Sequence, residues 1–487
     1  MSHPTLKCGY WPTSVDLGLV HWEHQTLSTS ADQIVLALPK LSAEQIQLCA
    51  RYVKAQAKQV FAQCPTYQIV QAIDVCIQSM LDETDPLRQQ VEQALQAITG
   101  YDREMLRLGI NACLRSFRRP ELLRFLSEDF HDPGLLDEFK PRFQSGWTKA
   151  YGAELLGVIW AGNVPGIPLW AQVAALLTKS PLIGKVASAE PIFASWFAQC
   201  VAKVAPELAQ TYAVLWWPGG DQASEHALTQ EVDVMMVYGG ESTLHAWQKK
   251  LSPSIRFLAH GHKFSAAFVS RDALDTRQAE RCARAVAWDV SQWDQQACYA
   301  PQSVFVERGA AVSPKDFAML VAGELKALAQ RYPRQSSNLT TKQAIAQWRQ
   351  RFTLAWMQGQ KVELIGPASA DWAVAYVDQA QQPEPSPTQR CVSIIAVDNI
   401  QQVTQLLEPY RKLLQTVALA ASPEQLFTIA HQLGAIGVNR ICALGSTSKP
   451  QAGWHHDGRF SLLDLVRMVD IEASAEILAQ DFAWYRD

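Results

Sequence analysis

The chain has 487 residues, of which 48% are hydrophobic and 18% are charged, and its formal net charge is −4 at pH 7. This length accommodates two or three domains with sizeable cores, and this composition excludes a chain that is disordered throughout. Its 43 Lys and Arg residues are balanced by 47 Asp and Glu residues, so no broad positive field exists and nucleic acid is not expected as a partner.

Ten cysteines are spread along the chain without a CxxC pair or a tight cluster. This spacing offers neither a zinc framework nor a disulfide scaffold, so we expect no metal site and reduced thiols. The N-terminus lacks a basic stretch followed by an apolar one, which favours a cytoplasmic protein.

The predicted elements begin with a helical N-terminal region, assigned to residues 1–140. Apolar residues recur there at helical spacing from about Ala43 to Phe130. The uncharged stretch from Leu155 to Thr178 is long enough to span a membrane, but two prolines and a glycine interrupt its middle. It is predicted to form a strand, a turn and a helix, and no transmembrane segment is expected.

Beyond this point short apolar runs alternate with helical stretches up to about residue 275, as in PLIGKVAS, YAVLWWPGG and VDVMMVYGG. Such alternation predicts βαβ units and a mostly parallel sheet. The loops at 216–221 and 237–242 contain Gly219, Gly239 and Gly240, whose backbone N–H groups could meet a phosphate or a nicotinamide at the start of a helix. Taken alone, both loops are also ordinary strand-to-helix turns, and a GxGxxG fingerprint is absent.

Residues 276–435 continue the alternation and contain Cys298, which lies between a long helical run and a strand. A thiolate at such a junction is accessible, whereas Cys200 and Cys282 lie within apolar helical periodicity and are predicted to be core residues. The last region, 436–487, is predicted to end in an amphipathic helix over the sequence FSLLDLVRMVDIE at 460–472.

Several motifs in a fixed order carry a resemblance to a known family. They are WAGNVPGIPLW, LIGKVASAEP, VYGGES, LAHGHKFSAAFV, QQACYAPQSVFVERG and PQAGWHHDGRF. Together they resemble the aldehyde dehydrogenase superfamily and, within it, the LuxC acyl-CoA reductases of bacterial luminescence, over roughly residues 145–475. The resemblance implies an α/β, aldehyde dehydrogenase-like fold. It divides the chain into the helical N-terminal region, a Rossmann-like NADP(H)-binding domain at 141–275, a catalytic domain at 276–435, and a segment at 436–487 that returns to the cofactor domain and a subunit interface.

Carried over residue by residue, the resemblance makes Cys298 the nucleophile and Asn163 the side-chain donor of an oxyanion hole. Lys185 falls where a lysine reaches the adenosine ribose, and Gly239 and Gly240 fall in the turn that packs against the dinucleotide. Each role is chemically sensible, because neutral N–H donors stabilise an anionic tetrahedral intermediate and a lysine can hydrogen-bond a ribose hydroxyl or phosphate.

The departures from the superfamily pattern concern two carboxylates. Ala259 stands where hydrolytic aldehyde dehydrogenases carry the glutamate that activates water, and no glutamate aligns with the ribose-binding one near 386–390. Glu384 is close, but we do not assign it that role. Loss of general-base assistance slows water attack by roughly 10²–10⁴-fold, which fits an enzyme that forms aldehyde.

Nearby histidines are the remaining candidates. His260 and His262 could activate Cys298 or protonate a leaving thiolate, or they could cap the strand and orient its loop. The run His455, His456, Asp457 invites a metal interpretation, but adjacent histidines point in different directions, so a place at the rim of a substrate channel is favoured.

The predicted function is NADPH-dependent reduction of a fatty acyl thioester, either acyl-CoA or acyl-protein, to a long-chain aldehyde through an S-acyl-Cys298 intermediate. The resemblance also implies NADPH rather than NADH, an acyl-protein synthetase partner, and a homo-oligomer. Three alternatives stay open: an ordinary NAD(P)-dependent aldehyde dehydrogenase, a CoA-acylating aldehyde dehydrogenase with a short-chain substrate, and a carrier or scaffold that is acylated on Cys298 without reducing the acyl group.

Overall fold

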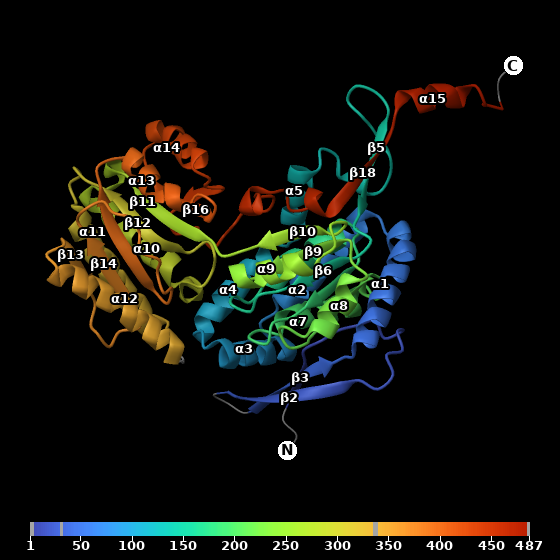
Figure 1. Cartoon of the computed structure of the whole chain (residues 1–487), viewed down its shortest axis with the longest axis horizontal. Helices are drawn as coiled ribbons and strands as arrows, with labels where there is room; N and C mark the ends of the chain where they lie inside the picture. Colours follow the sequence, from blue (N-terminus) through green and yellow to red (C-terminus); the bar gives the residue numbers. More distant parts are fainter. Residues whose placement is uncertain (1–3, 30–32, 335–338, 485–487) are drawn as a thin grey trace.

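The computed structural model describes residues 4–29, 33–334 and 339–484. Two α/β bodies lie side by side, and the C-terminal segment crosses from one to the other before its last helix, α15 (Ala473–Gln480), projects away from both (Figure 1). The expected α/β architecture with mostly parallel sheets is confirmed.

The N-terminal region contains both a sheet and helices. Its three strands pair in the order β1-β3-β2 and are β1 (Thr5–Lys7), β2 (His21–Ser28) and β3 (Gln33–Lys40). The helices that follow are α1 (Ala43–Gln63), α2 (Thr66–Met80), α3 (Pro86–Thr99), α4 (Arg103–Arg115) and α5 (Arg119–Asp129). The prediction of a helical region over 1–140 was therefore wrong for residues 5–7, 21–28 and 33–40, which form strands. An apolar run such as QIVLALPK becomes a strand because other segments pair with it, and the spacing of its apolar residues does not reveal that pairing.

The first α/β body is built on a five-stranded parallel sheet in the order β10-β9-β6-β7-β8. Its strands are β6 (Leu156–Ile159), β7 (Leu182–Lys185), β8 (Tyr212–Leu215), β9 (Val234–Tyr238) and β10 (Arg256–His260). Its helices are α6 (Ile167–Leu177), α7 (Phe193–Val204), α8 (Gln222–Thr229) and α9 (Glu241–Lys250). Helices α1, α8 and α9 cover one face, and α6 and α7 with α2 to α5 cover the other.

The stretch at 155–178 forms the predicted strand, turn and helix as β6 and α6. Among the residues that the structure describes, we find no helix with the length and hydropathy that a membrane span requires.

The second body is built on a seven-stranded sheet in the order β13-β14-β15-β12-β11-β16-β17, in which only β13 runs antiparallel to its neighbour. Its strands are β11 (Phe264–Val269), β12 (Pro301–Glu307), β13 (Val362–Ile365), β14 (Ala373–Val377), β15 (Cys391–Val397), β16 (Leu414–Ala420) and β17 (Arg440–Ala443). Its helices are α10 (Thr276–Ser291), α11 (Pro314–Arg331), α12 (Leu339–Met357), α13 (Ile400–Leu407) and α14 (Pro423–Ala435). Helices α10 and α11 cover one face, and α12 to α14 cover the other.

The predicted domain boundaries differ from the ends of this sheet. Strands β11 and β17 both belong to it, although the boundaries near 275 and 435 leave them in the neighbouring regions. The chain passes from the first sheet to the second at 261–263, between β10 and β11.

The C-terminal segment forms a fourth, three-stranded sheet with residues far away in the sequence. Strand β18 (Val466–Ile471) pairs antiparallel with β5 (Trp147–Gly152), which in turn pairs with β4 (Lys140–Pro141). The amphipathic helix predicted at 460–472 was therefore wrong, because the β-branched residues of VRMVDI pair with β5 in place of forming a helical face.

Candidate active site

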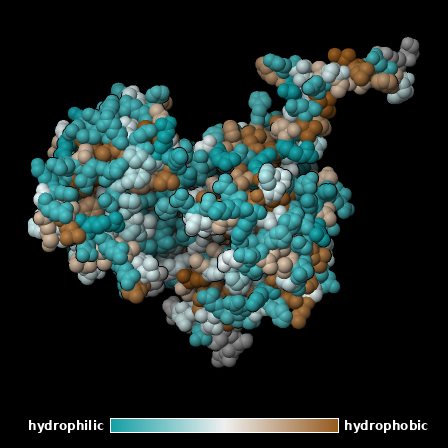
Figure 2. Space-filling view, in the orientation of Figure 1, coloured by the Kyte–Doolittle hydropathy of each residue, from teal (hydrophilic) through white to brown (hydrophobic). Residues whose placement is uncertain are grey.

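The predicted site residues converge where the two large sheets face each other. Asn163 follows β6 and His260 ends β10 at the carboxyl edge of the first sheet, while Cys298 precedes β12 at the opposing edge of the second. A cavity of about 390 Å³ lies at this junction, and all three residues line it. The surface is recessed between the two bodies in Figure 2. Ligands of parallel α/β sheets bind at carboxyl edges such as that of the first sheet, whereas the second sheet contributes the amino ends of its strands here.

The backbone just before Cys298 adopts an uncommon conformation. Trp293, Asp294 and Gln295 have φ angles of 51°, 47° and 64°, in the left-handed region that costs a non-glycine residue about 1–2 kcal/mol. The buried Asp294 carboxylate holds this turn, because it accepts a 2.7 Å hydrogen bond from Arg390 and forms a 2.9 Å ion pair with Arg334. Consecutive left-handed residues persist only where their surroundings fix them, so this turn gives Cys298 a defined place.

A second left-handed turn packs against the first. Thr388, Gln389 and Arg390 have φ angles of 62°, 61° and 61°, and the Gln389 N–H donates to the Asp294 carbonyl at 2.8 Å. Thr388 lines the cavity. Glu384, from the same loop, instead pairs with Arg351 at 3.1 Å in an exposed position, in line with our not assigning it a ribose-binding role.

Cys298 is half-buried, and its carbonyl accepts a 2.7 Å hydrogen bond from the Ser265 hydroxyl. Burial and the negative charge of Asp457 raise the pKa of its thiol to about 11, although a Gln415 side-chain hydrogen bond and the charge of Lys263 act in the opposite direction. The thiol is therefore protonated near pH 7 and needs a base before it can attack a carbonyl carbon.

Asn163 lies on the loop between β6 and α6. Helix α6 begins directly after Gly166, whose φ is 93°. The Asn163 side-chain amide donates to the Gln296 backbone carbonyl at 2.8 Å. The backbone carbonyl of Asn163 accepts a hydrogen bond from the Tyr101 hydroxyl at 2.6 Å. Because an amide nitrogen carries two hydrogens, the second N–H can serve a ligand beside the Cys298 loop.

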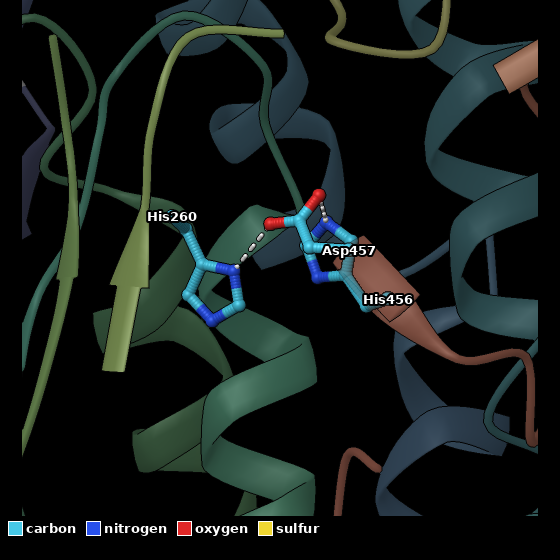
Figure 3. Close-up of side chains that lie close together, drawn as sticks. All are labelled: His260, His456 and Asp457. Atoms are coloured by element: carbon cyan, nitrogen blue, oxygen red, sulfur yellow. Dashed lines mark hydrogen bonds and ion pairs between the residues drawn. The ribbon is translucent and has the colours of Figure 1, made fainter. Parts of the chain in front are cut away.

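His260 is held on three sides. Its Nδ1 lies 3.0 Å from an oxygen of Asp457, and its ring stacks on Tyr238 at 4.6 Å and on His456 at 4.8 Å, with interplanar angles of 15° and 11°. The Asp457 carboxylate interacts with both histidines in Figure 3. Its other oxygen accepts a 2.7 Å hydrogen bond from the Gln415 amide.

Asp457 is anionic in this setting. Burial raises the pKa of its carboxyl, but the hydrogen bond from His260 and the charges of His456, His260 and Lys263 outweigh burial and hold that pKa well below its usual range. Burial lowers the pKa of His456 to about 4, so His456 is neutral near pH 7 and its charge acts on Asp457 only at acidic pH. Lys263 lies 3.5 Å from the carboxylate.

The same three groups do not suit a metal ion. Ligand atoms of His260, His456 and Asp457 all lie within 4.8 Å of one another. The two imidazole rings are stacked nearly parallel, however, so their in-plane lone pairs cannot meet on one ion. His456 and Asp457 both line the cavity, whereas His455 does not, and the place at the rim of a substrate channel stays a prediction for this run.

The other predicted residues are placed less centrally. His262 is exposed on the link between the two sheets and lines the cavity, as do Gly239 and Gly240. Lys185 is buried at the end of β7, where burial lowers its pKa against the opposing charge of Glu225. Lys185 and Gly219 share the carboxyl edge of the sheet but do not line the cavity among the described residues.

An apolar part of the cavity lining, called the apolar arm below, comes from helices α4, α5 and α6. Cys113 of α4 and Phe125 of α5 line it together with Trp170 and Ala174 of α6. The Trp170 ring packs edge-on against Phe125 and Phe117, with centroids 6.1 Å and 4.7 Å away. An apolar arm beside a thiol is a suitable place for an acyl chain.

Sequence reasoning missed the partners that hold these residues. Asp457 was noticed only as part of a histidine-rich run, and Gln415, Asp294 and Arg390 were not assigned a role. The only sequence signal was the His455–Asp457 run, because Asp457 meets a histidine 197 positions earlier.

Comparisons with known proteins agree with this architecture. The chain matches the family described as acyl-CoA reductase (LuxC) over residues 61–468. It is 25% identical over 394 residues to a long-chain acyl-protein thioester reductase of Photorhabdus laumondii, covering 80% of this chain and 78% of the relative.

Solved structures show the same fold at lower identity. An NAD-dependent benzaldehyde dehydrogenase from Corynebacterium glutamicum is similar with a TM-score of 0.70 at 15% identity, covering 93% of this chain and 96% of that one. An NADP-dependent glyceraldehyde-3-phosphate dehydrogenase from Bacillus halodurans, solved with NADP, is similar with a TM-score of 0.68 at 14% identity, covering 92% and 96%.

Proposed function

Because the chain belongs to the acyl-CoA reductase (LuxC) family, we propose that it reduces a long-chain fatty acyl thioester to the corresponding aldehyde. The observation that carries this proposal is one cavity that joins the Cys298 thiol and the Asn163 amide to an apolar arm. A related protein is named a long-chain acyl-protein thioester reductase, which favours acyl-protein or acyl-CoA as the substrate.

Cys298 is the proposed nucleophile. Its sulfur attacks the thioester carbonyl, and the thiol proton passes to a base while the Asn163 N–H and the Cys298 backbone N–H stabilise the oxyanion. The intermediate expels the carrier thiolate, which leaves as a thiol after taking up a proton, and Cys298 keeps the acyl group as an S-acyl thioester. His260 and, from the rim, His262 are the candidates for moving these protons.

The second half-reaction needs a hydride donor. The residues fit a nicotinamide nucleotide, because Gly239 and Gly240 open a turn onto the cavity and a Cβ at Gly240 would meet open space. When bound there, the cofactor supplies the hydride that reduces the acyl carbon. Asn163 again stabilises the oxyanion, which collapses to the aldehyde and releases Cys298.

The cofactor is proposed to be NADPH, with Lys185 at the adenosine ribose and Gly219 along the same sheet edge. The related solved structures include one NAD-dependent and one NADP-dependent enzyme, so the nucleotide has to be tested directly. An acyl-protein synthetase that delivers the acyl group remains the proposed partner.

Ala259 supports reduction over oxidation to an acid. This residue lies on β10 next to His260 and carries no carboxylate that could activate water. The second candidate function, a carrier that is acylated without reduction, is favoured only by the placement of Glu384 at the surface, away from the cavity.

The test uses purified protein with acyl-CoAs of graded chain length and either NADPH or NADH, following cofactor absorbance and trapped aldehyde. We expect aldehyde from long chains, and we expect Cys298→Ala to lower the rate by at least about 10³-fold. Cys64→Ala, at a half-buried thiol outside the cavity lining, is the matched control and should retain the parent rate. Full activity of Cys298→Ala would overturn the nucleophile, and acylation without cofactor oxidation would favour the carrier.

A further inference from the structure

We infer that Asp457, contributed by the C-terminal segment, is a positioning residue that fixes His260 as the group that takes the proton from Cys298 and returns it to the leaving thiolate. This inference rests on the proposed function and adds a residue to it. It starts from the 3.0 Å contact between Nδ1 of His260 and Oδ2 of Asp457.

The contact selects one tautomer of the histidine. An anionic carboxylate accepts hydrogen bonds only, so Nδ1 must carry the hydrogen that points at Asp457. A neutral imidazole then has its lone pair on Nε2, and His260 lines the same cavity as Cys298. The stacked rings of Tyr238 and His456 cover the two faces of the imidazole and fix its plane.

Asp457 is itself held in place from several elements. Gln415 of β16 donates to it at 2.7 Å, and Lys263 from the link between the sheets lies 3.5 Å away. Gln415 and Asp457 line the same cavity as Cys298 and His260. A backbone φ of 55° at Asp457 marks the tight turn that carries it.

The proton balance of the reaction requires such a group. As the Cys298 sulfur bonds to the acyl carbon, its proton moves to Nε2 of His260. When the carbon–sulfur bond of the substrate breaks, the same proton passes to the carrier thiolate, which departs as a thiol. After hydride addition and collapse of the oxyanion, the released Cys298 thiolate regains a proton from solvent through the same nitrogen.

If Asp457 acted on Cys298 only through its charge, removing that charge would change the acylation rate in the opposite direction. Its charge disfavours the Cys298 thiolate, so removing that charge would make the thiol more acidic and speed its reactions. If Asp457 acts through His260, removing the charge slows acyl transfer although the thiol becomes more acidic. The groups that face this cluster are Tyr238 of β9, Lys263, His456 and Cys298.

The experiment measures single-turnover S-acylation of Cys298 by palmitoyl-CoA in parent, Asp457→Asn, His260→Gln and the double variant, by intact-protein mass. We expect Asp457→Asn to lower the rate about 10–100-fold, as loss of a partner that orients a functional histidine does. In the double variant we expect no loss beyond that of His260→Gln. The matched control is Asp470→Asn on β18, whose carboxylate pairs with Arg142 at 3.4 Å and is half-exposed, and it should keep the parent rate.

Two further readouts separate positioning from a loss of structure. Alkylation of Cys298 by iodoacetamide at pH 8 should be as fast in Asp457→Asn as in the parent, or faster. In the parent protein, ¹⁵N shifts of labelled histidines should show His260 protonated at Nδ1, a measurement that needs no variant. The opposite tautomer, an unchanged acylation rate in Asp457→Asn, or additive losses in the double variant would each overturn the inference. A parent that palmitoyl-CoA does not acylate would instead contradict the proposed function.

Discussion

Cys298 is a half-buried residue whose surroundings keep its thiol protonated. Burial and the charge of Asp457 raise the pKa of this thiol to about 11. Because only the thiolate is alkylated, the rate of iodoacetamide modification at Cys298 should rise about tenfold per pH unit from pH 7 to pH 10. Peptide mass spectrometry of the segment that contains Cys298 measures this rate. A plateau near pH 8.5, where an ordinary thiol titrates, would contradict the expectation.

The buried pair of Asp294 and Arg390 explains how the loop that carries Cys298 is held in place. Both side chains are buried, and their 2.7 Å hydrogen bond joins two turns of left-handed backbone 96 residues apart. Removing one partner of such a buried pair leaves an uncompensated charge, which generally costs 3–5 kcal/mol. The precision of the Cys298 loop therefore depends on a residue from the loop at 381–390.

Among the elements, α6 connects the Asn163 loop to the apolar arm, and Trp170 is its largest side chain in the cavity. Replacing Trp170 with alanine removes contact area for a long acyl chain, at about 0.8 kcal/mol for each methylene that is no longer buried. We expect Trp170→Ala to raise KM for palmitoyl-CoA about 10–100-fold and to change KM for butyryl-CoA little. Steady-state kinetics with both substrates measure the effect.

Trp356→Ala is the control for this change, because Trp356 lies on α12 and is 62% exposed. It should leave both KM values as in the parent. Equal losses with the long and the short substrate would assign Trp170 to general folding of the site and not to chain-length selection.

Elements that depend on local signals were predicted well, and elements that depend on distant pairing were not. The strand, turn and helix of β6 and α6 follow from an apolar run, helix-starting prolines and a glycine within one segment. Strand β18 was predicted as a helix because its partner β5 lies far earlier in the chain, and the local spacing of apolar residues does not indicate that pairing.

The residues of the candidate site were likewise predictable only where they belong to a recognisable sequence motif. Cys298, Asn163 and His260 belong to motifs that a resemblance identifies, and the structure brings them to one cavity. Asp457 gains its role only from a turn that places it beside β10, so no local pattern could have assigned it.

At the scale of the whole molecule, the cavity is assembled from all parts of the chain. The C-terminal segment is fastened to the N-terminal helices, because Asp129 of α5 accepts hydrogen bonds from the backbone of Leu462 and Leu463 at 2.6 Å and 3.2 Å. Arg256 at the start of β10 donates to the carbonyl of Asp464 at 2.7 Å. These contacts hold the turn that carries Asp457 over the cavity.

Strand β18 and helix α15 lead the chain away from the compact part of the molecule (Figure 1), and this C-terminal arm fits the expected homo-oligomer. Helix α15 carries exposed apolar side chains, with Ile477 70% and Leu478 57% exposed, and Phe482, just beyond the helix, is 80% exposed. Brown surface marks this arm in Figure 2. The sheet below it ends in two edge strands, β18 and β4. Edge strands and an apolar helix on one arm favour pairing with a second copy of the chain, in which the same surface serves both partners.

We therefore expect the parent protein to be a dimer or a larger oligomer at micromolar concentration, and the double change Ile477→Asp with Leu478→Asp to weaken association. Each buried side chain of this kind contributes about 1.5–3 kcal/mol, so the dissociation constant should rise roughly 100-fold or more. Light scattering coupled to size-exclusion chromatography measures the mass. Leu354→Asp with Met357→Asp on α12, where both side chains are also exposed, is the control and should leave the mass unchanged. A monomeric parent would contradict the prediction. Acylation of Cys298 should persist in the dissociated variant, because neither Ile477 nor Leu478 lines the cavity.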